Sequence, residues 1–186
     1  METATKNLEN DHVYILRLLD VMQKMVDSIS TDIPHLEMVV SLIKDYVDNY
    51  HHAKEEILLF PLMAKKAFAN EQGSIDAMLH EHDDSRAFYK DMKKEIGAYK
   101  KGDDSALIQL YVNMQGYIDL IREHIEIEKN VLFHIANRTL SSEDQEDLVT
   151  DFEVAELGQT NGHIPKLILK IKGLELVFKE EEVFNQ

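Results

Sequence analysis

Residues 36–58 have the sequence LEMVVSLIKDYVDNYHHAKEEIL, in which apolar side chains recur three or four positions apart. This spacing places the side chains on one face of an α-helix, so the stretch predicts a helix that buries this face in a core. Two ionisable residues continue the apolar stripe. Its members are Leu36, Val40, Ile43, Val47, His51, Glu55 and Leu58.

The rest of the first 140 residues has the same helical periodicity, interrupted by turn-forming residues. The breaks fall at residues 33–34, 70–73, 101–104 and 139–141. With 7 Gly and 3 Pro in the whole chain, and no alternating stretch typical of a β-hairpin, the protein is predicted to be all-α. Helical segments of similar length joined by short loops are typical of an up-down-up-down four-helix bundle.

The length of 186 residues indicates one domain with an added terminal segment. We expect residues 1–140 to form the four-helix bundle. Residues 141–186 contain three Gly and one Pro and then an acidic run near their end. We expect them to form a C-terminal helical extension that ends in a solvated acidic tail.

The charge balance limits the classes of partner. The chain has 35 acidic and 20 basic residues, a net charge of −15, which repels phosphate backbones and anionic membrane surfaces. We therefore expect neither nucleic acid nor a membrane as a partner. The absence of Cys excludes thiol catalysis and Cys-ligated metals. No signal peptide and no long apolar run is present, so a cytoplasmic location is expected.

Each predicted core stripe contains a histidine, and two stripes carry a glutamate four residues later. A single core histidine usually hydrogen-bonds within the protein, but a buried carboxylate needs a compensating cation or hydrogen-bond network. Together these residues indicate a metal site, with a single ion or a metal-free polar core as the alternatives. The candidate ligands are His12, His51, Glu55, His82, His124 and Glu128.

In an up-down-up-down bundle, the starts of the first and third helices lie at the same end as the ends of the second and fourth. At about 1.5 Å per residue, all the candidate ligands then reach a similar depth, and we expect them to form one dinuclear site. Imidazoles and carboxylates without thiolate favour iron, ahead of manganese or zinc. Such a ligand set also leaves coordination positions open for a small exogenous ligand.

His52 and Glu56 repeat the spacing of His51 and Glu55 one residue along the chain. In an α-helix they lie on a polar stripe, so we expect them to face water or the edge of the bundle. Arg86, one turn after His82, is expected either to pair with a ligand carboxylate or to extend to the surface.

These motifs resemble the hemerythrin-like, or HHE cation-binding, domain family. The resemblance covers about residues 7–138, and its most specific part is the run His-His-x-Lys-Glu-Glu-x-x-Leu-Phe-Pro at residues 51–61. It implies a four-helix bundle that holds non-heme iron, commonly two ions bridged by carboxylates and an oxo or hydroxo group. In this chain the four histidines would be terminal ligands, with Glu55 and Glu128 as the bridges.

The chain departs from the family's oxygen carriers at two positions. Those proteins have a further His one turn after the third-helix His, where this chain has Arg86, and a final His-x4-Asp motif, where this chain has His-x3-Glu. The set of four histidines and two glutamates looks more like that of bacterial di-iron proteins associated with nitrosative stress and iron–sulfur repair. The resemblance implies a protein that binds or senses O2, nitric oxide or peroxide. The alternatives are an enzyme that reduces nitric oxide or peroxide, and an iron-buffering scaffold; no protein partner is indicated.

Overall fold

The computed structural model describes residues 3–66, 72–158 and 162–184. Every regular element in these ranges is a helix, which confirms the predicted all-α class. Three segments are π-helices, in which hydrogen bonds span five residues instead of four. In chain order the elements are α1 (Ala4–Ser28), α2 (Ile33–Leu42), π-helix η1 (Ile43–His52), π-helix η2 (Glu55–Leu59), α3 (Phe60–Lys66), α4 (Gln72–Tyr99), α5 (Ala106–Ile127), π-helix η4 (Glu128–Leu132), α6 (Phe133–Thr139), α7 (Ser142–Gly158) and α8 (His163–Phe184).

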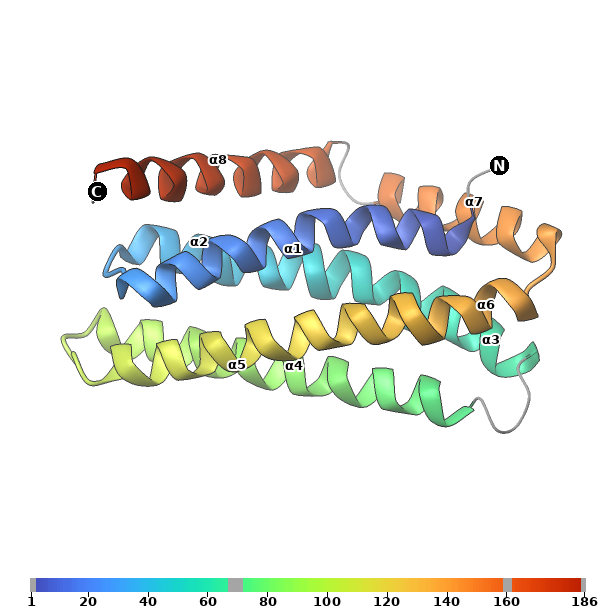
Figure 1. Ribbon diagram of the computed structural model, residues 1–186, viewed down its shortest axis with the longest axis horizontal. Coiled ribbons are helices and arrows are strands. Elements are labelled where there is room, and N and C mark those ends of the chain that lie inside the picture. The colour runs from blue at the N-terminus through green and yellow to red at the C-terminus, as the bar shows by residue number, and fades with distance from the viewer. Residues whose placement is uncertain (1–2, 67–71, 159–161, 185–186) are drawn as a thin grey trace.

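Several elements join end to end into long rods. The segments α2, η1, η2 and α3 form one rod, and α5, η4 and α6 form another (Figure 1). Helix α4 packs along α5, and α1 contacts both α5 and η1. The predicted break between the second and third helices, residues 70–73, lies partly outside the described residues. Helix α4 begins at Gln72, within this predicted break.

The apolar core consists of two clusters with polar residues between them. Along α1, Leu8 belongs to the smaller cluster and Ile15 to the larger one, while His12 lies between them. The two composite rods and the single helix α4, which with α1 make four rods, show the same order. The candidate ligands therefore form a polar layer that crosses the core.

The C-terminal helices pack against the rods (Figure 1). Helix α8 buries Ile171 and Phe178 in the larger cluster, and Arg17 of α1 pairs with Glu175 of α8. Helix α7 buries Phe152 in the smaller cluster. The C-terminal extension thus shares the core of the bundle. The division of the chain into residues 1–140 and residues 141–186 stays a prediction. The backbone is helical through Phe184, whereas the side chains of the expected acidic tail lie outside the described residues.

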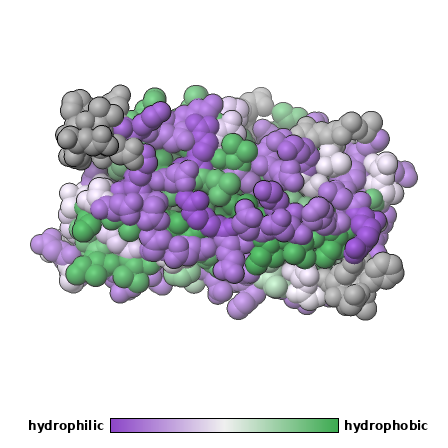
Figure 2. Space-filling view, viewed as in Figure 1, coloured by the Kyte–Doolittle hydropathy of each residue, from purple (hydrophilic) through white to green (hydrophobic). Residues whose placement is uncertain are grey.

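The exterior agrees with the charged composition. Figure 2 shows a face that is mostly hydrophilic, with hydrophobic groups scattered between the polar ones. In the part of the chain that the structure describes, we find no helix with both the length and the apolar character needed to cross a membrane.

Candidate metal centre

The structure brings all six candidate ligands together in the polar layer. Each of them is buried, and each comes from a different helical segment. The apolar stripes explain this placement, because burial of the stripes turns the histidines and glutamates inward with them. The buried set is His12 on α1, His51 on η1, Glu55 on η2, His82 on α4, His124 on α5 and Glu128 on η4.

One group of possible metal ligands draws on α1 and on the π-helical turns of two rods. It contains His12, His51, Glu55 and Glu128, whose ligand atoms all lie within 4.8 Å of one another. The Nε2 atoms of His12 and His51 are 3.0 Å apart. His12 Nε2 is 3.1 Å from Oε2 of Glu128. These nitrogens and oxygens converge on one point.

A second group lies beside the first and shares Glu55. It contains His52, Glu55, His82 and His124, again with ligand atoms within 4.8 Å of one another. The Nε2 atoms of His82 and His124 are 3.2 Å apart. Oε1 of Glu128 is 3.4 Å from His124 Nε2, while its Oε2 approaches His12. Glu55 and Glu128 therefore lie between the two groups, where bridging ligands would lie.

The expectation that His52 faces water or the bundle edge is wrong. Its side chain is 1% exposed, and its ring stacks on that of His82 with a centroid separation of 3.8 Å. The cause is η1, because a π-helix has more residues per turn than an α-helix and rotates successive residues by a smaller angle. His51 and His52 can thus both point into the core.

The buried carboxylates show why a cation fits here. All four oxygens of Glu55 and Glu128, and Nδ1 of His52, are buried without a hydrogen bond of acceptable geometry, although imidazole nitrogens lie near them. Unpaired buried carboxylates are unfavourable, and metal coordination would satisfy them. The donor set of imidazoles and carboxylates suits iron, manganese or zinc. These side chains therefore fit the metal ions that the sequence predicts.

Outer carboxylates orient three of the imidazoles. Nδ1 of His82 lies 2.7 Å from Glu56, and Nδ1 of His124 lies 2.7 Å from Glu81. Such contacts hold the ring so that Nε2 points toward the metal, and they raise the basicity of the ligand. The corresponding distance from His51 to its partner, Asp11, is 3.4 Å.

These outer carboxylates were not among the functional residues predicted from the sequence. A signal was available, because each is adjacent in sequence to a candidate ligand: Asp11 to His12, Glu56 to Glu55 and Glu81 to His82.

Two basic residues pair with these outer carboxylates and neutralise part of their negative charge. Lys54 is buried and bonds to Asp11. Arg86 bonds to Glu56 at 2.5 Å and to Asp48 at 2.8 Å. Arg86 thus pairs with the carboxylate that contacts a candidate ligand, not with the ligand carboxylates themselves. Glu56, which was expected to face water or the edge of the bundle, is partly exposed and joins Arg86 to His82.

The titration behaviour of the buried groups reflects this environment. Burial lowers the pKa of His51 to about 4 and lowers the pKa of His82, so both rings are neutral at pH 7. Burial also opposes the charged form of His124, but the Glu128 carboxylate raises the pKa of His124 to about 9. Burial and the charge of Glu128 raise the pKa of Glu55 well above its usual range. Without metal, His124 is therefore protonated at pH 7, and the shift at Glu55 favours its protonated form.

Comparison with known proteins points to one family. The family model described as the Hemerythrin HHE cation binding domain matches residues 3–136. The chain is 33% identical over 90 residues to the iron-sulfur cluster repair protein YtfE of Pectobacterium atrosepticum, covering 47% of this chain and 41% of the relative. It is 31% identical over 126 residues to YtfE of Musicola paradisiaca, and this match covers 64% of this chain and 56% of the relative. The chain thus spans about half the length of these relatives. No solved structure matches it significantly.

Proposed function

The chain belongs to the hemerythrin HHE cation-binding domain family, and from this premise we propose that it is a non-heme di-iron protein that binds or senses O2, nitric oxide or peroxide. The observation that carries the proposal is the pair of fully buried glutamates whose oxygens make no hydrogen bond, placed among five imidazoles. Two irons would supply redox chemistry and open coordination positions.

The proposed ligands divide unequally between the two ions. His52, His82 and His124 belong to one group, whereas His12 and His51 belong to the other. Glu55 and Glu128 are the proposed bridges. Five imidazoles and two bridging carboxylates supply nine bonds of the roughly twelve that two octahedral ions need. The ion with two histidines has more open positions, and we propose that the exogenous ligand binds there.

Neighbouring carboxylates orient the proposed ligands, and apolar side chains shield them from water. Glu56 and Glu81 orient His82 and His124 through their Nδ1 atoms. The stacked rings of His12 and Phe133, with centroids 5.7 Å apart, help to close the layer toward the smaller apolar cluster. The apolar clusters on both sides of the layer exclude water from the proposed ligands.

Anaerobic metal analysis with absorption spectroscopy tests the proposal. We expect about two irons per chain and a near-ultraviolet charge-transfer band, and we expect azide or nitric oxide to change the visible spectrum. Protein that retains no metal would contradict the proposal. A spectrum that responds to neither azide nor nitric oxide would indicate a closed structural site.

The matched relatives favour a second candidate function, because both are named iron-sulfur cluster repair proteins. In this alternative the di-iron centre takes part in repair of iron–sulfur clusters. Recovery of activity in a cluster-damaged iron–sulfur enzyme, with and without this protein, separates the two candidates. Recovery that depends on the protein would favour repair, and no recovery would favour ligand binding or sensing.

We also propose that the four rods form an up-down-up-down bundle over residues 1–140, with residues 141–186 as its helical extension. The packing of α4 along α5 and of α1 against α5 supports this arrangement. An experimental structure of the full chain tests it.

A further inference from the structure

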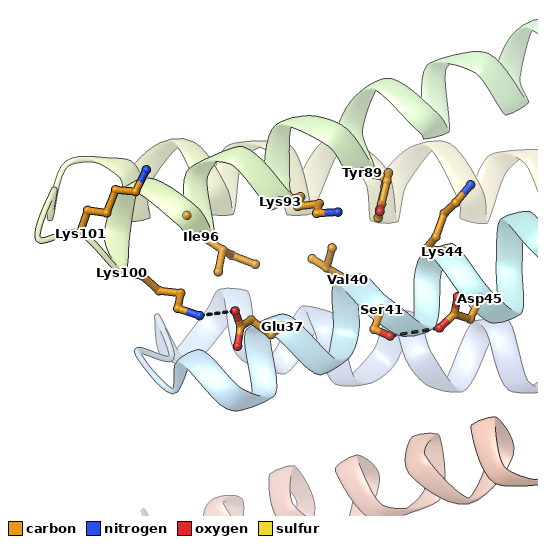
Figure 3. A pocket seen from close by; sticks show the side chains of 11 residues that line it. Glu37, Val40, Ser41, Lys44, Asp45, Tyr89, Lys93, Ile96, Lys100 and Lys101 are labelled. Atoms are coloured by element: carbon orange, nitrogen blue, oxygen red, sulfur yellow. Dashed lines mark hydrogen bonds and ion pairs between the residues drawn. The ribbon is translucent and has the colours of Figure 1, made fainter.

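A groove with a volume of about 790 Å³ lies between the α2–η1 part of the second rod and α4 (Figure 3). It is separate from the metal centre. Along α4 its lining runs from Tyr89 to Gly97, which follow His82 by 7 and 15 residues, or about 10 and 22 Å along the helix. Pockets for small molecules have volumes on the order of 300–1,000 Å³. The groove is therefore large enough for a small ligand that does not contact the proposed irons.

The floor of the groove is apolar. Val40 of α2 and Ile96 of α4 face each other across it in Figure 3, and the ring of Tyr89 borders it farther along α4. Val40 and Ile96 belong to the larger core cluster, so the groove opens directly onto the core. Such a floor favours a ligand with an apolar body.

The rim of the groove is positively charged, although the whole chain carries a net charge of −15. Four lysines and two acidic residues line it, so its formal charge is 4 − 2 = +2. This local excess of positive charge favours an anion. The charged residues are Lys44, Lys93, Lys100, Lys101, Glu37 and Asp45.

Two of these lysines are already paired with carboxylates. Lys100 contacts Glu37 at 2.6 Å, and Lys44 contacts Asp48 at 2.5 Å. Lys93 and Lys101 form no ion pair with any residue in the described part of the chain. Their ammonium groups can therefore bind an anionic ligand without breaking an existing ion pair.

Gly97 leaves space at the wall of the groove. Glycine inside a helix is less stable than alanine, and a Cβ atom at this position would meet nothing within 4 Å. A Cβ atom therefore fits here without a clash, and because Gly97 lines the groove, a larger side chain at this position would reduce its volume. This position offers a way to fill the groove while the fold is kept.

We propose that this groove binds an anionic amphiphile, a small molecule with one carboxylate or phosphate group and an acyl or aromatic body. The apolar body would pack on Val40, Ile96 and Tyr89, and the anion would pair with Lys93 and Lys101. This site is independent of the di-iron proposal, because the groove shares no residue with the proposed metal ligands.

Calorimetric titration of the full chain with decanoate, decyl phosphate and decyltrimethylammonium tests the proposal. We expect one bound anion per chain and at least tenfold weaker binding of the cation with the same apolar chain. The tighter of the two anions identifies the headgroup as carboxylate or phosphate. Absence of binding by both anions, or equal binding of the cation, would overturn the proposal.

Variants locate the binding in the groove. Gly97→Leu should abolish anion binding, and the double variant Lys93→Glu with Lys101→Glu should weaken it at least tenfold. Lys90→Glu is the matched control, because Lys90 is exposed on the same helix and does not line the groove. Binding that survives in the double variant, or that Lys90→Glu weakens equally, would refute the site even if Gly97→Leu failed to fold.

Discussion

The ring of His52 is held in the polar layer by its neighbours. It stacks on His82 and lies edge-on to His124, with centroids 5.6 Å apart. Its Nδ1 atom is buried without a hydrogen bond. A buried imidazole in this position is neutral, because burial lowers its pKa well below the usual value. His52 is therefore in the form that binds a metal.

Replacement of His52 tests its role as a ligand. We expect His52→Ala to lower bound iron below two per chain and to change the absorption spectrum, because one ion would lose an imidazole. His80→Ala is the control, since the His80 side chain is 78% exposed and lies outside both ligand groups. Iron content equal to that of the unchanged protein would remove His52 from the proposed ligand set.

Metal loading should release protons. In the metal-free protein at pH 7, His124 is protonated because its pKa is raised to about 9, and the raised pKa of Glu55 favours its protonated form. Metal binding requires neutral His and ionised Glu, so loading releases the proton of His124, and the shift at Glu55 adds to this release. Above about pH 9, His124 is already deprotonated before loading, and the release should fall.

Calorimetric loading in two buffers with different ionisation enthalpies measures this release. The apparent enthalpy of loading should differ between the buffers at pH 7 and differ less at pH 10. Equal enthalpies in both buffers at pH 7 would contradict the protonation of His124 in the metal-free protein.

At the scale of elements, the contact between α4 and α5 depends on a glycine. A Cβ atom at Gly116 of α5 would lie 2.6 Å from the ring of Phe88 on α4. Gly116 thus permits the two helices to approach closely at a cost in helix propensity. By contrast, a Cβ atom at Gly173 of α8 would meet nothing within 4 Å.

These two glycines give a matched pair of substitutions. Gly173→Ala should raise the free energy of unfolding by about 0.5–1 kcal/mol, through helix propensity alone. Gly116→Ala gains the same propensity but overpacks against Phe88, so it should be less stable than Gly173→Ala by about 1–3 kcal/mol. Urea unfolding of both variants measures the difference. Equal stability of the two variants would show that Phe88 moves aside without cost.

At the scale of the whole molecule, we expect the polar layer to make the stability of the fold depend on metal. Buried imidazoles and carboxylates separate two apolar clusters, so the folded chain has unsatisfied polar groups in its centre. Metal binding to the folded state satisfies them and stabilises the fold by mass action.

Removal of metal should therefore lower the melting temperature. A free iron concentration of about 100 times the dissociation constant adds about 2.7 kcal/mol, which corresponds to a change of roughly 5–10 °C for a chain of this size. Calorimetric melting of metal-free and metal-loaded protein measures the change. A metal-free protein that melts at the same temperature would show that the polar layer is stable without ions.

Apolar periodicity alone was enough to predict the all-α class and the inward direction of the six candidate ligands: His12, His51, Glu55, His82, His124 and Glu128. Apolar periodicity is a local property, and burial of the apolar stripe carries every residue on that stripe into the core. The tertiary structure alone decided the burial of His52, the outer carboxylates on the imidazoles and the shared core of the C-terminal helices. The physical reason is that these features depend on π-helical turns and on side chains from other rods, whereas α-helical periodicity describes one helix at a time.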